Sequence, residues 1–458
     1  MNVGQVNYYT SQIVFLDLVK QAQDWGLGSG GWEVPVDAHG WPTFVPIGKR
    51  VGFIARAPRA GRYVARWEGD GEIAVAHGGR IVRASARRAE LELEGGEAHF
   101  YLIRSERGQP LRRLSIVPAE READHEKVLF DPEFLALAPP FGVLRFMDWL
   151  RINGSTQRRW EDRASPEHFS QCTERGASLE YALELCNRVK ADCWINLPAM
   201  VDDDYVARAA EVVRDRLDPA LKAYVEYSNE IWNFPHGDWC QAEGERLGMP
   251  RGWDARLRYQ ARRSKEIFRI FERILGPRRL VRVLAGQTWD ARLQLLAEWE
   301  DAGRSADVLA IAPYFCDDLE QVAGGRATTP RALAERCAAD VERIRERVRR
   351  SRAVAERFKL PLVGYEGGQH LVTGGALHAD AALQRVLDGA NRDPAMGIAY
   401  RRFLEMWREE KGGVLLLYTL IGEPSKWGRW GLVERLGPPP EDSPKYRAAL
   451  EFLDRVVR

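Results

Sequence analysis

Two glutamates in this sequence follow apolar runs of the length expected for buried strands. Glu230 comes two residues after the run 223–228, and Glu366 comes directly after the run 361–365. Carboxylates at the ends of different strands can lie on opposite sides of one bond, as acid/base chemistry on a glycoside requires. We therefore take Glu230 and Glu366 as the candidate catalytic pair.

The segments around these glutamates alternate between strand-like and helix-like patterns. A short strand is expected at 2–8, followed by a helix from about 11 to 25. Further strands are expected near 142–148, 192–197, 222–228, 280–285, 307–312, 361–366 and 413–418. Helices are expected near 178–190, 203–216, 254–275, 290–302, 330–358, 380–410 and 443–457. Such alternation predicts an α/β fold with parallel strands, and eight units fit a closed (β/α)8 TIM barrel. An open doubly wound sheet is the competing layout.

The pattern changes to a period of two between the first helix and the second strand. Short alternating segments such as 63–67 and 98–103 are separated by glycine-rich turns. Regular short strands with such turns predict an antiparallel β-sandwich. We therefore expect three parts. Residues 1–34 start the barrel, residues 35–125 form an inserted β-sandwich, and residues 126–458 complete the barrel and end in a C-terminal tail.

The run Tyr-Ser-Asn-Glu-Ile-Trp-Asn, residues 227–233, carries a resemblance to a known group. Its Asn229-Glu230 pair resembles the Asn-Glu that ends strand four in clan A of the glycoside hydrolases, which includes cellulase-like, mannanase-like and arabinofuranosidase-like barrels. The resemblance implies that Glu230 is the acid/base, that Glu366 at the end of strand seven is the nucleophile, and that Asn229 binds the sugar 2-hydroxyl. An alternative role for Asn229 is to fix the turn through its side-chain amide.

Two further residues could support the nucleophile. Arg145 is a charge inside an apolar strand, which is costly to bury unless it is paired. It resembles the arginine that supports the nucleophile in the clan, or it forms a structural bridge to Asp148 or another barrel carboxylate. Tyr314 ends strand six, where the clan often places a tyrosine against the nucleophile, although a role in the core is the alternative. Many clan members carry a histidine beside this tyrosine, where Ala312 and Pro313 stand here. Glu226 is assigned a structural role.

Tryptophans in loops after the strands are candidates for sugar platforms, because indole rings can cover the apolar faces of sugars. Trp289, Trp427 and Trp430 are the ones we select. The stretch 425–431 around the last two is rich in glycine and polar residues, which is unusual for core. Packing is the alternative role for each ring.

Composition narrows the choice of partners. The 67 Lys and Arg nearly balance the 66 Asp and Glu, so there is no overall basic charge to attract nucleic acid or an anionic membrane. No apolar run reaches 18 residues, so no membrane-spanning segment is expected. The six cysteines have no metal-ligand spacing, and the eight histidines are scattered. We expect no catalytic metal and no cofactor. The sequence does not decide whether any of the cysteines form a disulfide. The start lacks a signal sequence, so the protein is either cytoplasmic or exported with its signal removed.

Together these features predict a hydrolase, a retaining glycosidase that cleaves β-glycosidic bonds in an oligo- or polysaccharide with two glutamates. A noncatalytic carbohydrate-binding barrel is one alternative. A barrel enzyme of another chemistry, such as a metal hydrolase or an aldolase, is the second. The sugar, the linkage, endo or exo action and the oligomeric state are not encoded in these motifs.

Overall fold

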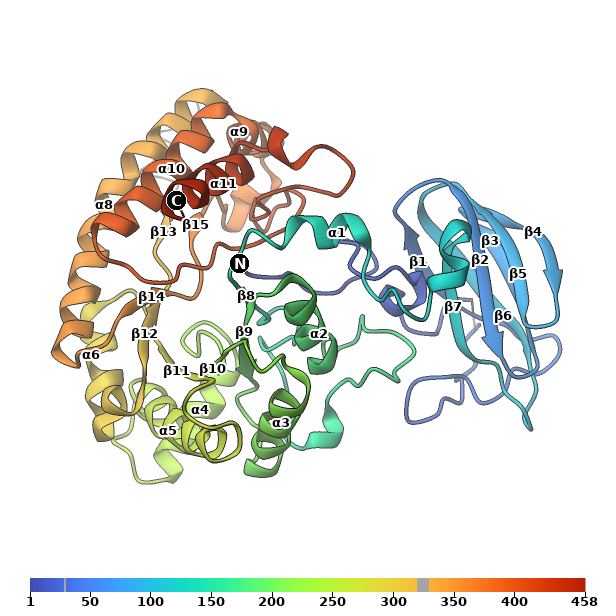
Figure 1. The fold of residues 1–458 in the computed structure, drawn as a ribbon, viewed down its shortest axis with the longest axis horizontal. Coiled ribbons are helices and arrows are strands. Elements are labelled where there is room, and N and C mark those ends of the chain that lie inside the picture. Colours follow the sequence, from blue (N-terminus) through green and yellow to red (C-terminus); the bar gives the residue numbers. More distant parts are fainter. Residues whose placement is uncertain (29, 319–328, 458) are drawn as a thin grey trace. The chain divides into compact units, whose positions relative to one another are not determined.

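The computed structural model describes residues 1–28, 30–318 and 329–457 (Figure 1). The chain divides into two compact units. Unit 1 comprises residues 1–4, 137–162 and 182–458, and unit 2 comprises residues 5–136 and 163–181. Within the described residues, no helix has both the length and the apolar character needed to cross a membrane.

Unit 1 is built on a curved parallel sheet. Its strands are β8 (Val143–Arg145), β9 (Asp192–Leu197), β10 (Ala223–Tyr227), β11 (Leu280–Ala285), β12 (Val308–Ile311) and β14 (Leu362–Gly364). They neighbour one another in the order β14-β12-β11-β10-β9-β8, and every pair is parallel. A doubly wound sheet would reverse its strand order at a switch point. This sheet keeps sequence order throughout, so the mixed α/β fold with a parallel sheet is confirmed.

Both edges of this sheet continue as single bridges rather than strands. Asn2 forms a parallel bridge with Arg145 at one edge, and Leu415 forms one with Gly364 at the other. The backbone N–H of Asn2 also donates to the carbonyl of Leu417 at 2.9 Å. The segments expected as the first and eighth strands therefore hydrogen-bond to each other.

Helices follow the strands of unit 1 (Figure 1). Their bounds are α2 (Leu179–Val189), α3 (Asp203–Arg216), α4 (His236–Arg246), α5 (Ala255–Leu275), α6 (Asp290–Glu298), α8 (Pro330–Arg357), α9 (Ala381–Arg392), α10 (Pro394–Glu409) and α11 (Pro444–Val457). Side-chain caps mark several starts, since the carboxylate of Asp202 accepts from the N–H of Tyr205. The single helix predicted over 380–410 is wrong. It breaks at Asp393, which is extended because a proline follows it and disfavours helical backbone there.

Apolar residues of the parallel strands gather in one cluster inside the sheet. Each strand of the sheet contributes, and so does the segment of the expected eighth strand. Its buried members are Val143, Trp194, Tyr224, Val283, Ala285, Val308, Ala310, Val363, Tyr365 and Leu416.

Unit 2 contains two antiparallel sheets. One has the order β1-β6-β3 and the other β4-β5-β2-β7. The strands are β1 (Val51–Ala57), β2 (Gly61–Glu68), β3 (Gly71–His77), β4 (Gly79–Ser85), β5 (Arg88–Leu93), β6 (Gly96–Ser105) and β7 (Arg112–Pro118). Residues of both sheets, including Phe53, Phe100, Leu91 and Ile116, belong to one hydrophobic cluster. The predicted antiparallel strands therefore form within the segment 35–125.

The helix predicted over about 11–25 is wrong. That segment is irregular apart from the 3-10 helix η1 (Leu18–Gln21). Its backbone bonds to other segments instead, because the N–H of Leu16 donates to Leu129 and the N–H of Gln23 donates to Ile54. The apolar residues that suggested a helical stripe are buried, with Val19 and Ala22 in the core of unit 2. Unit 2 thus begins at residue 5 and also takes residues 163–181, which the sequence assigned to the barrel.

Candidate active site

The ends of the parallel strands bring the predicted site residues to one edge of the sheet. Arg145 is the last residue of β8, and Glu226 lies near the end of β10. Glu230 follows β10 by three residues, and Glu366 follows β14 by two. Because the strands are parallel and adjacent, their carboxyl ends open on the same side.

Arg145 is the centre of a buried hydrogen-bond network. Its Nε and Nη2 donate to the two carboxylate oxygens of Glu226 at 3.0 and 3.1 Å. Its Nη1 donates to Oδ1 of Asn2 at 3.0 Å and to Oε1 of Glu366 at 2.7 Å. Its Nη2 also donates to Oδ1 of Asn229 at 2.9 Å. A guanidinium has five N–H donors, so the whole capacity of Arg145 is used.

The charge of this fully buried arginine is compensated on two sides. Burial acts to lower the pKa of Arg145, but the charges of Glu226 and Glu366 raise it overall. Burial in turn raises the pKa of Glu226, and Arg145 opposes that shift. Nε1 of Trp194 donates to Glu226 at 2.7 Å. Both proposed roles of Arg145 are therefore present in one side chain, a structural bridge to Glu226 and a contact with Glu366.

Glu366 is held by one cation and one hydroxyl. Besides Arg145, the hydroxyl of Tyr314 donates to Oε2 of Glu366 at 2.8 Å. The carboxylate is buried, and each of its oxygens accepts a hydrogen bond from the protein. These two hydrogen bonds fix the orientation of the carboxylate, as the predicted role of a nucleophile requires.

Glu230 lies in a different electrostatic setting. Burial, and then the negative charge of Glu366, raise the pKa of Glu230 to about 7. The hydroxyl of Tyr365 donates to its Oε1 at 2.9 Å, and Nδ2 of Asn233 donates to its Oε2 at 2.7 Å. The backbone φ is +37° at Glu230 and +57° at Ser228, a region that side chains other than glycine rarely adopt. Such backbone strain concentrates at functional loops.

This pKa predicts the basic side of a pH–activity profile. If Glu230 is the predicted general acid, it must be protonated to act, so kcat/KM should fall as pH rises through about 7. Because the charge of Glu366 contributes to the raised value, Glu366→Gln should lower the pKa of Glu230. Titration of Glu230 by carbon-13 NMR in wild type and in this variant measures the shift. An unchanged pKa in the variant would show that the two carboxylates do not interact.

Asn229 is held firmly by protein partners. Its Oδ1 accepts from Arg145, and its Nδ2 donates to Oδ1 of Asn153 at 3.0 Å. Its backbone carbonyl accepts from Nε2 of His236 at 2.8 Å, while the other ring nitrogen of His236 accepts from the N–H of Gly154 at 3.3 Å. One amide N–H of Asn229 is left after the bond to Asn153. The two roles considered for this residue are therefore compatible.

Several members of the site escaped the sequence reasoning. Asn2 and Asn153 bond to Arg145 and Asn229, but their partners lie far away along the chain. Tyr365, next to Glu366 in sequence, contacts Glu230 and could have been suspected from that position. The hydroxyl of Tyr418 donates to Asp148 at 2.7 Å. Burial, together with the nearby charge of Glu366, raises the pKa of Asp148 to about 6.

An aromatic cluster surrounds Tyr314. The ring of His370 lies 5.2 Å from that of Tyr314, and the ring of Trp430 lies 5.6 Å from it. Trp430 also packs against Tyr418 at 5.5 Å. The sequence lacks a histidine beside Tyr314, and His370 contacts the tyrosine from another strand end instead. Trp430 thus packs near the carboxylates, whereas Trp427 is exposed and packs on His378.

A cavity of about 610 Å³ opens beside Glu230. Its lining combines strand-end residues with parts of α6 and α8. The residues are Glu230, Trp232, Gln287, Thr288, Trp289, Asp290, Ala312, Pro313, Tyr314, Asp317, Ile344, Arg347, Arg350, Tyr365 and His370. Trp289 is therefore brought to the same cavity as Glu230 and Tyr314. Trp427 and Trp430 are not among the described residues that line it.

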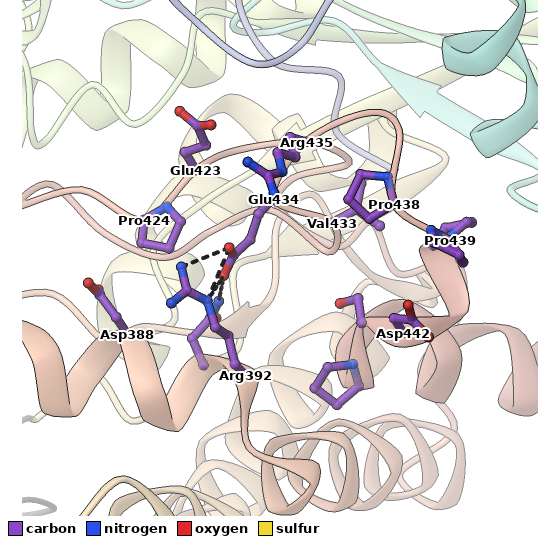
Figure 2. Close-up of a pocket in the computed structure, with 14 residues that line it drawn as sticks. Asp388, Arg392, Glu423, Pro424, Val433, Glu434, Arg435, Pro438, Pro439 and Asp442 are labelled. Atoms are coloured by element: carbon purple, nitrogen blue, oxygen red, sulfur yellow. Dashed lines mark hydrogen bonds and ion pairs between the residues drawn. The ribbon is translucent and has the colours of Figure 1, made fainter.

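A larger cavity, of about 700 Å³, lies elsewhere in unit 1 (Figure 2). It is bounded by the end of α9 and by the proline-rich segment 438–440. An ion pair between Arg392 and Glu434, at 2.9 Å, runs along its wall. None of the predicted site residues lines it, so its size does not make it the better candidate for the chemistry.

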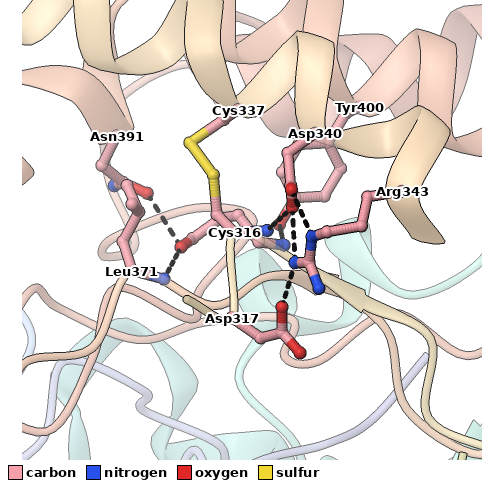
Figure 3. Close-up of a disulfide and its surroundings, with 9 residues drawn as sticks. Cys316, Asp317, Cys337, Asp340, Arg343, Leu371, Asn391 and Tyr400 are labelled. Atoms are coloured by element: carbon pink, nitrogen blue, oxygen red, sulfur yellow. Dashed lines mark hydrogen bonds and ion pairs between the residues drawn. A yellow bond between two sulfur atoms is a disulfide. The ribbon is translucent and has the colours of Figure 1, made fainter. Parts of the chain in front are cut away.

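A disulfide joins Cys316 to Cys337, close to the segment that carries Tyr314 (Figure 3). Cys316 directly follows the short strand β13 (Tyr314–Phe315), and Cys337 lies in α8. The N–H of Cys316 also donates to Oδ2 of Asp340 at 2.7 Å. β13 pairs with β15 (Gly368–Gln369), which follows Glu366. The crosslink therefore fixes the start of the segment after Tyr314 to a helix.

Removal of this disulfide should destabilise the protein. The crosslink closes a loop of 21 residues. Its loss in a Cys316→Ala/Cys337→Ala variant should lower the free energy of unfolding by about 3 kcal/mol, because the unfolded chain gains freedom. Denaturant unfolding with and without a reducing agent measures this. The reducing agent should destabilise wild type and leave the double variant unchanged, and an equal response of both proteins would contradict the prediction.

The chain is similar to several solved structures. No protein-family model matches the chain, and no curated protein matches it. Similar solved structures include a family 51 α-L-arabinofuranosidase from Bifidobacterium longum, with a TM-score of 0.47 and 12% identity over 70% of this chain and 67% of that one. The family 51 arabinofuranosidase from Xanthomonas axonopodis pv. citri has a TM-score of 0.41 and 12% identity, covering 64% of this chain. The family 10 protein from Paenibacillus barcinonensis has a TM-score of 0.39 and 11% identity, over 70% of this chain and 91% of that one.

The chain spans 60% of the length of the Xanthomonas axonopodis enzyme. Glycoside hydrolases of families 51, 5 and 10 are among the structural neighbours, and all of these belong to clan A. This is the group that the Asn229-Glu230 motif resembles.

Proposed function

We propose that the protein is a retaining glycoside hydrolase that cleaves β-glycosidic bonds of an oligo- or polysaccharide. The observation that carries the proposal is the different environment of two neighbouring carboxylates. Glu366 accepts from Arg145 and Tyr314, whereas burial and the charge of Glu366 raise the pKa of Glu230 to about 7. A carboxyl group with a raised pKa is suited to act as the acid, and a carboxylate oriented by two fixed donors is suited to act as the nucleophile.

In the proposed mechanism, Glu366 attacks the anomeric carbon of the sugar. The glycosidic C–O bond breaks as Glu230 gives its proton to the leaving oxygen. Glu230, now ionised, takes a proton from water, and that water attacks the anomeric carbon and releases Glu366. Two displacements restore the original configuration, and this course requires carboxyl groups about 5 Å apart. No step requires a metal or a cofactor.

Arg145 and Tyr314 are proposed to position the nucleophile. Arg145 donates an N–H to Oε1 of Glu366 and Tyr314 donates its O–H to Oε2, so the carboxylate is oriented before the sugar binds. Preorganised donors of this kind cost no rearrangement during the reaction. The remaining amide N–H of Asn229 is proposed to donate to the sugar 2-hydroxyl. Trp430 and Trp427 are proposed as sugar platforms at the edge of the site.

The proposed scaffold is a closed barrel of eight parallel segments. The bridges of Asn2 with Arg145 and of Leu415 with Gly364 support closure, as does the bond from Asn2 to Leu417. The residues from 35 to 125 are proposed to form a β-sandwich inserted into the barrel chain. The shared hydrophobic cluster of the two antiparallel sheets supports this arrangement.

A panel of aryl glycosides tests the proposed function. The panel contains β-glucoside, β-mannoside, β-xyloside and β-galactoside, and also an α-L-arabinofuranoside because the resemblance includes arabinofuranosidase-like barrels. We expect hydrolysis of at least one member, with proton NMR showing a first product of retained configuration. Binding of oligosaccharides without hydrolysis would favour a noncatalytic barrel. A product of inverted configuration would contradict the retaining mechanism.

A further inference from the structure

The cavity beside Glu230 has a tryptophan on its wall that is held in place from behind. Trp289 is 50% exposed, although it lies directly before α6 and lines the cavity. The guanidinium carbon of Arg292 lies 4.0 Å from the centre of its ring. One face of the indole is thus covered by a cation, and half of the side chain stays accessible. When another molecule covers the apolar surface of an exposed indole, the free energy is lowered.

The residues that pack against Trp289 are connected to the loop that carries Glu230. The same guanidinium lies 3.8 Å from the ring centre of Trp253, so Arg292 is stacked between two indoles. Nη1 of Arg292 donates to Oε1 of Gln287 at 2.6 Å, which fixes its orientation. Arg256 stacks on Trp253 at 5.0 Å and donates to the carbonyl of Ile231 at 3.3 Å. Ile231 follows Glu230, so a row of alternating arginines and tryptophans connects Trp289 to the acid/base loop.

The position of the cavity indicates which part of a substrate it receives. Glu230, which is proposed to protonate the leaving oxygen, lines the cavity. Glu366, which attacks from the other side of the bond, is not among the described residues that line it. The group attached through the leaving oxygen must lie on the side of the acid. The volume of the cavity, about 610 Å³, lies within the range of ligand-binding sites.

We propose that Trp289 is the platform for the first sugar ring of the leaving group, and that Arg292 is a positioning residue for this platform. This inference rests on the proposed glycosidase function and adds a specificity for it. The substrate then has a pyranose or furanose ring, not a small alcohol, on the departing side. The C–H face of that ring stacks on the free face of the indole, while its hydroxyls meet the polar residues of the wall. A platform held by stacking before binding loses little entropy when the sugar arrives.

Two substrates with the same glycone separate this role from catalysis. An oligosaccharide places a sugar ring on Trp289, whereas a glycosyl fluoride has no ring in its leaving group and needs little acid assistance. Trp289→Ala should lower kcat/KM for the oligosaccharide by about 10-fold to 100-fold, which corresponds to the loss of one buried apolar contact. The fluoride should stay within about threefold of wild type, because nothing in it contacts Trp289.

Matched variants identify the stacking. Trp289→Phe keeps an aromatic face and should recover most of the oligosaccharide activity. Arg292→Ala should give the same substrate pattern as Trp289→Ala with a smaller loss, mainly in KM. Equal losses on both substrates, or no loss on either, would overturn the proposal. The proposal would also be overturned if Trp289→Ala kept full activity on the oligosaccharide while Trp289→Phe lost activity on it.

A binding measurement keeps this proposal separate from the proposed function. If wild type hydrolyses no member of the panel, the glycosidase function fails. Calorimetric titration of wild type and Trp289→Ala with gluco-, manno-, xylo- and galacto-oligosaccharides then tests the platform. Weaker binding by the variant would support the platform without the chemistry. Equal affinities, or no binding by wild type, would overturn it.

Discussion

Glu366→Ala is expected to lose nearly all hydrolytic activity, by roughly 10⁴-fold or more in kcat. The loss is large because no other group stands where this carboxylate accepts from Arg145 and Tyr314. The variant should still fold, although it leaves an N–H of the buried Arg145 without its partner. Glu226 still pairs with this arginine at 3.0 Å, so the positive charge stays compensated. Rates on the best aryl glycoside of the panel, measured beside the circular dichroism of the variant, test this expectation.

Small anions give a control that is specific to a nucleophile. Azide is a small anionic nucleophile, and it should restore turnover of activated aryl glycosides by Glu366→Ala. The product should be a glycosyl azide of inverted configuration, because a single displacement replaces two. Azide should leave the wild-type rate unchanged. Activity near wild type in a folded Glu366→Ala protein, without azide, would end the assignment of Glu366 as nucleophile.

The strand ends were predictable because one local pattern encodes both the strand and the residue at its end. Apolar runs of five or six residues before Glu230 and Glu366 predict buried strands, and parallel strands open on one edge. That reasoning needs no knowledge of distant contacts. It also found Arg145, because a charge within an apolar run must have a partner. The identities of its partners were not predictable, since Asn2 and Glu226 lie far from it along the chain.

Segments without regular structure were predicted least well. Around residue 15, the apolar spacing fits a helix, but the residues are buried in unit 2 and the segment is irregular apart from the 3-10 helix at Leu18–Gln21. Tertiary hydrogen bonds replaced helical ones there, and spacing does not report such partners. Near residue 394, the helical pattern continues on both sides of a break that proline causes. The position of Trp289 on the cavity wall depends in the same way on Arg292 and Trp253, which no local motif connects.

Glu230→Ala is expected to be selective for the leaving group. The raised pKa of Glu230, about 7, makes it a proton donor at neutral pH, and a poor leaving group needs that proton. Loss of the acid should therefore lower kcat/KM for an oligosaccharide by about 10²-fold to 10⁴-fold. An aryl glycoside with a dinitrophenol leaving group departs without protonation, so formation of its glycosyl-enzyme should be nearly as fast as in wild type. Hydrolysis of that intermediate then becomes slow, because no base activates the water.

A rapid burst of dinitrophenol followed by slow turnover is the signature of this imbalance. Stopped-flow absorbance measures the burst, and its size should equal the concentration of active sites. Asn233→Ala is a matched control, because it removes the 2.7 Å hydrogen bond to Glu230 and keeps the carboxyl group. That variant should show a shifted pH profile without a burst. Equal losses of Glu230→Ala on the oligosaccharide and on the dinitrophenyl glycoside would mean that Glu230 is not the acid, and the cavity beside it would then lose its assignment to the leaving group.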